Sequence, residues 1–430
     1  MKMKKFIIVS VFMSLFLTSC DEEFLDPTRA SEEDVFSSRD GLIGAANGLQ
    51  SRYSVGRQSP FGYALITGNG FTTNELGVPQ AGNLDEVALY SGSGEVLPNN
   101  GIVSNIWAQS LILNSESQKV INNINRLTVP VEKATLLVHA SIFKALALGN
   151  LIQFFERVPI STAKNATFNS RAEVLAEVIK TLEDTKSSLS SATGFTGIAP
   201  GIDYTNTVNA LLARFYLISG NLDKAFEHAS LVNLTVRSGF QFDAVNQNAI
   251  AATAFLVANN YQPIGRSLGL PASLQPNAAD GRINFYINPT STVSAVKGAG
   301  FWGAISSTVP VYLPGEMILI RAEVLARKNQ LPEAVTEINR VLQKTAAADA
   351  WGVGANLPAY SGTVDQPSLL TEIYRNRCIE LFMSGLKLED TRRFNRPGAG
   401  APGAERNRNW YPYPDSERFN NPNTPANPAN

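Results

Sequence analysis

The feature that most restricts the fold of this chain is a unit of helix, short turn and second helix, which occurs twice. In the first unit the apolar residues Phe215-Tyr216-Leu217 precede the turn Gly220-Asn221-Leu222 and the alanine-bearing segment Lys224-Ala225. The same order returns within 314–344, around the turn Asn329-Gln330-Leu331. Each unit predicts two antiparallel helices that pack closely through small side chains.

This unit is similar to the tetratricopeptide repeat, in which stacked helix pairs bury a shared core and build a curved scaffold. Apolar residues at three- or four-residue spacing predict further helices at 107–126, 133–155, 171–190, 205–219 and 223–235. The stretches 107–155 and 171–219 would form two more divergent pairs. We therefore expect a mostly α fold, with tetratricopeptide-like pairs at about 105–235 and 314–394 and little β structure.

Two long stretches, 59–101 and 236–312, lack a strong helical pattern and are rich in small and polar residues. Long irregular loops are uncommon in compact domains and often carry function, although these could simply pack over the helices. Aromatic rings beside amide side chains suit sugars, which present apolar C–H faces and hydroxyl rims. The candidate ligand-binding residues are Phe71, Asn74 and Tyr90 from the first stretch, and Tyr261, Tyr286, Phe301 and Trp302 from the second.

Trp302 is the favoured candidate of this set. Its neighbours Gly300 and Gly303 suggest an exposed loop tip. The alternative is that Trp302 is an aromatic plug over the helices. Trp107, by contrast, sits in helical register and is expected in the core.

The N-terminus predicts secretion and lipid anchoring. Lys2, Lys4 and Lys5 precede an apolar run, Phe6–Leu17, which is too short to span a bilayer but suits a signal peptide. The run ends in Leu17-Thr18-Ser19-Cys20, which resembles the bacterial lipobox. We expect a signal peptide at 1–19, acylation of Cys20 and a tether over 20–40. In the alternative, an ordinary secreted protein, Cys20 is a free thiol.

Composition and motifs argue against several classes of function. The net charge is −1 and no basic stripe is present, so nucleic acid is not an expected partner. Two histidines and two cysteines make a His/Cys metal site improbable, and no cofactor motif is found. The chain has no nucleophile elbow, zinc-protease motif or phosphate loop, so we expect a protein that is not an enzyme. With Cys20 acylated, Cys378 has no disulfide partner and is expected to be a buried thiol.

The most specific block lies near the C-terminus and reads LLTEIYRNRCIELFMSGLKLEDTRRF over 369–394. Helical spacing aligns Ile373, Arg377, Leu381 and Ser384 on one face, and Gly385 provides a break suited to a helix end. The charges that follow are too mixed in sign to form an anion clamp. A pairing of Glu380 with Arg377 would be a local salt bridge.

This block resembles the C-terminal signature of the RagB/SusD family, the surface nutrient-capture lipoproteins of Bacteroidota. The matching positions are Ile373, Arg377, Glu380, Leu381, Gly385, Asp390 and Arg393. Asn376, Ser384 and Lys387 depart from the family pattern, and the first two replace glutamates of its ion-pair network. Looser matches occur around Phe36–Gly48, at Val309-Pro310-Val311-Tyr312 and in the closing Tyr411-Pro412-Tyr413-Pro414.

The resemblance implies a single SusD-like domain over 41–430, anchored to the outer membrane and facing outward. It implies a non-catalytic protein that captures a nutrient, most plausibly an oligosaccharide, for a SusC-like TonB-dependent channel. A tetratricopeptide-like interaction scaffold and a peptide-binding lipoprotein are the alternatives.

Overall fold

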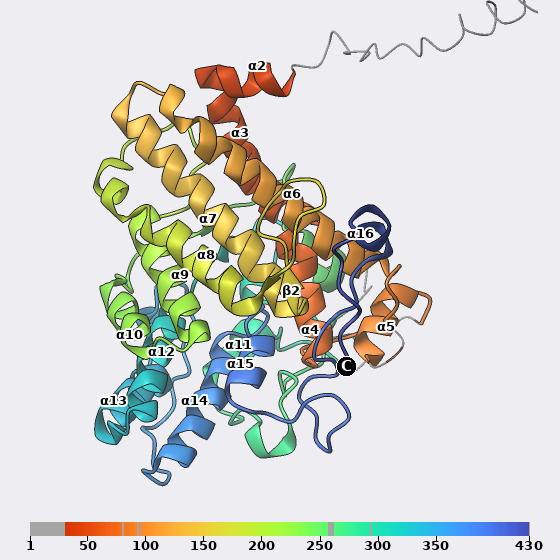
Figure 1. Ribbon diagram of the computed structural model, residues 1–430. Coiled ribbons are helices and arrows are strands. Elements are labelled where there is room, and N and C mark those ends of the chain that lie inside the picture. Colours follow the sequence, from red (N-terminus) through yellow and green to blue (C-terminus); the bar gives the residue numbers. More distant parts are fainter. Residues whose placement is uncertain are drawn as a thin grey trace, which may run out of the picture.

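The computed structural model describes residues 31–79, 81–92, 94, 96–256, 262–292 and 295–429. It is 55% helical with 4% strand, which confirms the expected mostly α class (Figure 1). The expected signal peptide and Cys20, together with the first part of the tether, lie outside the described residues. The described chain starts at Ser31, whose side chain caps α2 (Glu32–Ser37) in a reciprocal bond pair with Asp34.

The N-terminal half contains long helices joined by short ones. These are α3 (Arg39–Ser54), the π-helix η1 (Pro60–Gly68), α4 (Asn69–Thr72), α5 (Leu84–Ser91), α6 (Gly101–Asn123), the 3-10 turn η3 (Ile124–Arg126), α7 (Pro130–Phe154), α8 (Arg171–Glu183), the 3-10 turn η4 (Lys186–Ser191), α9 (Tyr204–Ser219) and α10 (Leu222–Leu231). Helix α7 is long and apolar enough to cross a membrane, but 94% of its apolar window is buried inside the protein. It is the central helix of the core, against which α3, α6, α8 and α9 pack.

The C-terminal half alternates irregular segments with a second helix pair. Its helices are the π-helix η5 (Ala251–Leu256), the 3-10 turn η6 (Ala272–Leu274), α11 (Gly281–Tyr286), the 3-10 turn η7 (Gly300–Trp302), α12 (Pro314–Arg327), α13 (Leu331–Leu342), the 3-10 turn η8 (Ala346–Ala348), α14 (Gln366–Glu380), α15 (Lys387–Arg393) and α16 (Asp415–Asn420). In Figure 1, α9, α10, α12 and α13 follow one another along one side of the molecule.

Both predicted helix–turn–helix units are confirmed. Gly220, at φ +86°, ends α9, and Asn221 N–H donates to the Tyr216 carbonyl at 2.9 Å before its own side chain caps α10. Asn329, at φ +60°, likewise turns the chain between α12 and α13, where Gln330 N–H donates to the Leu325 carbonyl at 2.9 Å. The two pairs meet through α10 and α12, so the paired helices form one continuous layer.

The stretch 59–101 was expected to be irregular, and this expectation is wrong for much of its length. Ser59 caps η1, with Pro60 in the first turn, and α4, α5 and the start of α6 follow. A π-helix closes i→i+5 hydrogen bonds, so its side chains do not repeat at three- or four-residue spacing. A search for the α-helical period therefore does not detect it.

The stretch 236–312 is largely irregular, as expected, and two-residue strands tie it to the rest of the chain. β1 (Leu76–Gly77) pairs antiparallel with β5 (Gln262–Pro263), which brings the two predicted loop stretches together. β4 (Gly239–Phe240) pairs with β6 (Val309–Pro310), and β2 (Arg157–Val158) pairs with β3 (Asn169–Ser170). Strands this short hold loops in place without forming an extended sheet.

The C-terminal block forms α14 and α15, and Gly385, at φ +78°, lies in the break between them, as predicted. The first helix is shorter than expected, because α14 ends at Glu380 and does not reach Ser384. The expected local pair of Arg377 with Glu380 is wrong. Arg377 Nε donates to Asp390 at 2.8 Å, while Glu380 accepts from Arg282 of α11 at 3.1 Å and also binds Lys344.

Glu380 and its partners are buried inside the protein. Arg282 and Glu380 are both 0% exposed, so their charges are neutralised by buried partners, including Asp280, rather than by water. The ion-pair network links Asp280, Arg282, Glu380 and Lys344, although Asn376 and Ser384 depart from the family pattern. Asn376 joins it by accepting from Arg282 at 2.9 Å.

Candidate ligand-binding site

Trp302 does not lie at an exposed loop tip, so that expectation is wrong. The side chain is 2% exposed and its ring stacks on Phe61 at 6.3 Å between centroids. Gly300, at φ +54°, permits this arrangement because a Cβ there would lie 2.6 Å from the Phe285 ring. The glycine marks a close approach between packed segments rather than an exposed turn.

Phe301 and Tyr286 are also buried, in the same aromatic cluster as Trp302. Phe301 contacts Phe285 at 5.0 Å and Trp351 at 5.8 Å, and Tyr286 contacts Phe301 at 6.2 Å. The Tyr286 hydroxyl donates to the Glu380 carbonyl at 2.5 Å. The structure thus brings these predicted residues together, but as the interior plug that was the alternative interpretation.

The cavity under this cluster is too small for a sugar. It is lined by Trp302, Phe61, Arg214 and Met383 among others, and its volume is about 40 Å³. That is room for about one water molecule.

The candidates of the first stretch divide between core and surface. Phe71 is 0% exposed, whereas Tyr90, whose ring meets it edge-on at 6.5 Å, is 39% exposed. Asn74 adopts φ +60° and turns the chain toward β1. Asn407 ties this region to the C-terminus by donating to the carbonyls of Phe71 and Tyr90. Tyr261 lies outside the described residues.

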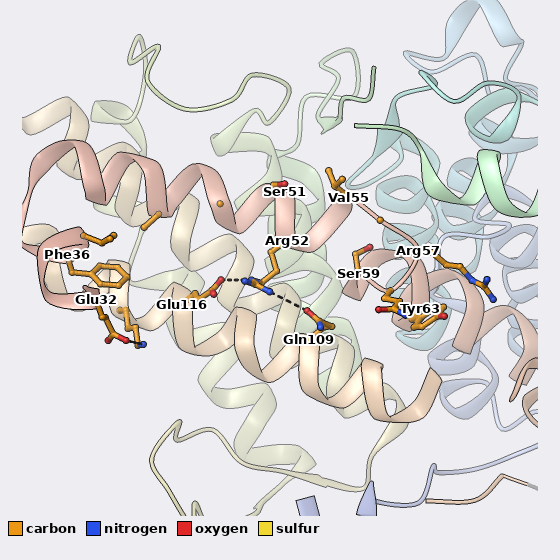
Figure 2. Close-up of a pocket in the computed structure, with 16 residues that line it drawn as sticks. Glu32, Phe36, Ser51, Arg52, Val55, Arg57, Ser59, Tyr63, Gln109 and Glu116 are labelled. Carbon is orange, nitrogen blue, oxygen red and sulfur yellow. Dashed lines mark hydrogen bonds and ion pairs between the residues drawn. The ribbon is translucent and has the colours of Figure 1, made fainter. Parts of the chain in front are cut away.

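A groove of about 990 Å³ runs along the N-terminal helices and is the candidate surface site for a ligand (Figure 2). This volume is at the upper end of the range for small-molecule sites. Its walls come from α2, α3, α6 and the start of η1. The lining residues are Glu32, Val35, Phe36, Ala45, Gly48, Ser51, Arg52, Val55, Gly56, Arg57, Gln58, Ser59, Tyr63, Gln109, Glu116 and Lys119.

Small residues on α3 create the groove. Ala45, Gly48 and Ser51 recur every three residues and therefore line one face of that helix. A Cβ built on Gly48 would meet no atom within 4 Å, so space is open above the backbone there. Gly56, at φ +89°, then turns the chain from α3 toward η1, whose Ser59 and Tyr63 close the far end.

Ion pairs cross the groove between helices. Arg52 of α3 pairs with Glu116 of α6 at 2.6 Å and approaches Gln109 at 3.4 Å, as the dashed lines of Figure 2 show. Lys119 of α6 pairs with Glu32 of α2 at 2.5 Å. These side chains keep α2 and α3 in register with α6 while leaving polar atoms at the surface of the groove.

The η1 end of the groove carries an aromatic residue and a third ion pair. The guanidinium of Arg57 lies over the Tyr63 ring, 5.9 Å from its centroid, and pairs with Glu86 of α5. Burial raises the pKa of the Tyr63 phenol, so this group stays protonated at neutral pH. The end that faces α2 instead presents the half-buried ring of Phe36.

Within the described residues, no group of three or more His, Cys, Asp and Glu side chains is placed to hold a metal ion. Both histidines have structural contacts. His139 bonds to the Ala46 carbonyl at 3.0 Å, and His228 bonds to Asn209 at 2.9 Å.

Sequence reasoning missed the groove because its lining is ordinary in composition. The large apolar residues of α3, such as Leu42, Leu49 and Tyr53, are buried in the core. The interleaved small residues at Ala45, Gly48 and Ser51 were the available signal. Their meaning depends on how far α6 stands from α3, which the local sequence does not specify.

The stacked helix pairs, with a surface groove along α2, α3 and α6, define a mostly α-helical protein of the tetratricopeptide-like class. More narrowly, the fold is that of the SusD superfamily, and this confirms the resemblance seen in the C-terminal block. The likeness extends over about nine-tenths of the chain.

Three solved structures illustrate the likeness. A SusD superfamily protein of Bacteroides thetaiotaomicron has a TM-score of 0.71 and 17% identity, covering 90% of this chain and 99% of that one. A SusD-like carbohydrate binding protein of Bacteroides fragilis has 0.68 and 14%, covering 90% and 99%. A SusD-like carbohydrate binding protein of Bacteroides vulgatus has 0.66 and 15%, covering 89% and 96%. No protein-family model and no curated protein sequence matches the chain.

Proposed function

We propose that this protein is a non-catalytic lipoprotein that captures oligosaccharides at the cell surface. The observation that carries the proposal is the SusD-like fold over about 90% of the chain, shared with proteins described as carbohydrate binding. The groove along α3 and α6 adds a surface site whose size and polar lining suit such a ligand.

The proposed binding mode is hydrogen bonding along the floor of the groove. Gln58, Gln109 and Ser51 supply donors and acceptors, while Phe36 offers apolar surface for a sugar face. The predicted residues Trp302, Phe301, Tyr286 and Phe71 would support the site only as core, since all four are buried. Tyr90 is the one described aromatic of the predicted set that remains accessible, and it provides a second surface for testing.

Residues 41–430 would act as a single SusD-like domain, tethered through an acylated Cys20 to the outer membrane. The partner proposed from the resemblance is a SusC-like TonB-dependent channel that receives the captured sugar. The signal-peptide motif and the lipobox at 17–20 support export and anchoring. Two alternatives, a peptide-binding lipoprotein and an interaction scaffold, predict instead that no oligosaccharide binds.

The test is calorimetric titration of the soluble form, residues 21–430, with malto-, cello-, manno- and xylo-oligosaccharides. Gly48→Leu is the groove variant, because the new side chain enters open space without forcing the backbone. Gly44→Leu is its matched control. Gly44 lies on the same helix, is exposed, has no atom within 4 Å of its built Cβ and does not line the groove.

Micromolar binding that Gly48→Leu abolishes and Gly44→Leu leaves intact is the expected result. If both variants still bind, the capture role stands and the binding site is outside the groove, with the surface around Tyr90 as the next candidate. If no oligosaccharide binds and a peptide does, the result would favour the peptide-binding lipoprotein.

A further inference from the structure

The groove carries charged side chains, yet each of its cations is neutralised locally. Arg52 has Glu116, Lys119 has Glu32, and Arg57 has Glu86 within ion-pair distance. Among the described residues that line the groove, no lysine or arginine lacks a carboxylate within 4.0 Å. The groove is therefore rich in hydrogen-bonding groups but offers no free positive charge.

We propose that the groove selects uncharged oligosaccharides against acidic ones, and that the Arg52–Glu116 pair is the element that discriminates. This inference rests on the proposed function and specifies the chemistry of its ligand. It extends to any anionic glycan, whether the charge is a carboxylate or a sulfate.

The position of the pair suits this role. Figure 2 shows Arg52 extending from α3 toward Glu116 and Gln109 of α6, between the Phe36 end and the Tyr63 end of the groove. The side chains of Arg52 and Glu116 are 36% and 35% exposed, so a ligand can reach both. A chain of sugar rings lying along the groove must pass this pair.

A neutral sugar can use the pair without separating it. A hydroxyl both donates and accepts, so adjacent hydroxyls can donate to the Glu116 carboxylate and accept from the Arg52 guanidinium. The Gln109 amide adds a further donor and acceptor beside them. Hydrogen bonds to charged groups are the stronger class, which gives the pair a large share of the binding.

An acidic sugar meets the opposite situation. Its carboxylate could reach the remaining N–H groups of Arg52 only by lying beside the Glu116 carboxylate, whose charge repels it. At the α2 end, Glu32 holds Lys119 in the same way. The repulsion between these like charges raises the free energy of the complex with an acidic sugar. It does not act on the complex with a neutral sugar.

The experiment compares hexamers of one length in the wild-type soluble form. Maltohexaose, cellohexaose and mannohexaose are the neutral probes, and hexagalacturonate is the acidic probe. Glu116→Gln then frees the charge of Arg52 without changing the size of the side chain. We expect the best neutral hexamer to lose about tenfold in affinity and hexagalacturonate to gain by a similar factor.

Asp184→Asn is the matched control, because Asp184 also belongs to an exposed ion pair between helix positions, with Lys180 of α8. It changes the net charge of the protein by the same amount and does not line the groove. It should shift neither affinity. The gain of Glu116→Gln for hexagalacturonate should also fall as salt is added.

The outcomes separate the inference from the function beneath it. If the wild type binds hexagalacturonate as tightly as the neutral hexamers, or Glu116→Gln alters neither affinity, the selection is refuted while glycan capture stands. If neither class of hexamer binds the wild type, the proposed function fails and the inference fails with it.

Discussion

The buried network around Glu380 gives the sharpest test of the fold, because sequence and structure assign it different partners. Glu380 is 0% exposed and neutralises both Arg282 and Lys344. After Glu380→Gln these cations keep one carboxylate each, Asp280 and Asp349, both at 2.7 Å. Breaking a buried pair outright costs about 3–5 kcal/mol, so with partners retained we expect a loss of about 3 kcal/mol.

The assay is urea unfolding of the soluble form, followed by far-ultraviolet circular dichroism, with a double-mutant cycle. Glu380→Gln combined with Arg282→Met should show a coupling energy of roughly 1–3 kcal/mol, the range for residues of one network. Combined with Arg377→Met the coupling should be smaller by at least about 1 kcal/mol, since Arg377 is bound to Asp390 instead.

Asp184→Asn provides the exposed reference and should change the unfolding free energy by less than about 1 kcal/mol. The reasoning is refuted if Glu380→Gln is no more destabilising than this reference. Coupling of Glu380 to Arg377 that equals or exceeds its coupling to Arg282 would restore the local pair suggested by helical spacing.

Three further results are expected. Cys378 should resist thiol reagents until the protein is unfolded, because burial raises its pKa to about 12; labelling of the native soluble form at neutral pH would contradict this. Burial raises the pKa of Glu75 from 4.5 to about 7. The folded state therefore holds this proton more tightly than the unfolded chain, and stability present below pH 4.5 is lost as pH rises through 7. Glu75→Gln should remove up to about 3 kcal/mol of that loss, seen as unfolding midpoints that fall less between roughly pH 5 and pH 8 than those of the wild type. Gly149→Ala should destabilise by about 1–3 kcal/mol, because its Cβ would lie 2.4 Å from the Phe215 ring, whereas Gly48→Ala, in open space, should stabilise by up to about 1 kcal/mol. Equal effects of the two alanines in urea unfolding would contradict the packing argument.

Much of the helical layer could be predicted because amphipathic helices show their period in the sequence. The turns at Gly220 and Asn329 were identified because these residue types favour the left-handed conformation that follows a helix end. Gly385 is also left-handed, but it lies in the connection between α14 and α15. The π-helix η1 was not predicted, because its i→i+5 hydrogen bonds give the side chains a different repeat from that of an α-helix.

The predicted site residues show where local reasoning stops. Glycines beside Trp302 were compatible with an exposed turn or with close packing, and only the position of Phe285 decides between them. The partner of Glu380 is likewise 98 residues away, at Arg282. The groove depends on the separation of α3 from α6. Each of these properties is set by tertiary packing.

The return of the C-terminal segment has a consequence for how the chain reaches its native state. Tyr411 stacks on Phe154 at 5.2 Å and bonds to Thr72, and Tyr413 stacks on Phe155 at 6.0 Å. Contacts between such distant positions form slowly, so we expect the end of α7 to be covered late in folding. A chain truncated before Tyr411 would leave the end of α7 uncovered, and we expect proteases to degrade it rapidly under conditions in which the full chain survives. Equal protease resistance of the full and truncated chains would contradict this expectation.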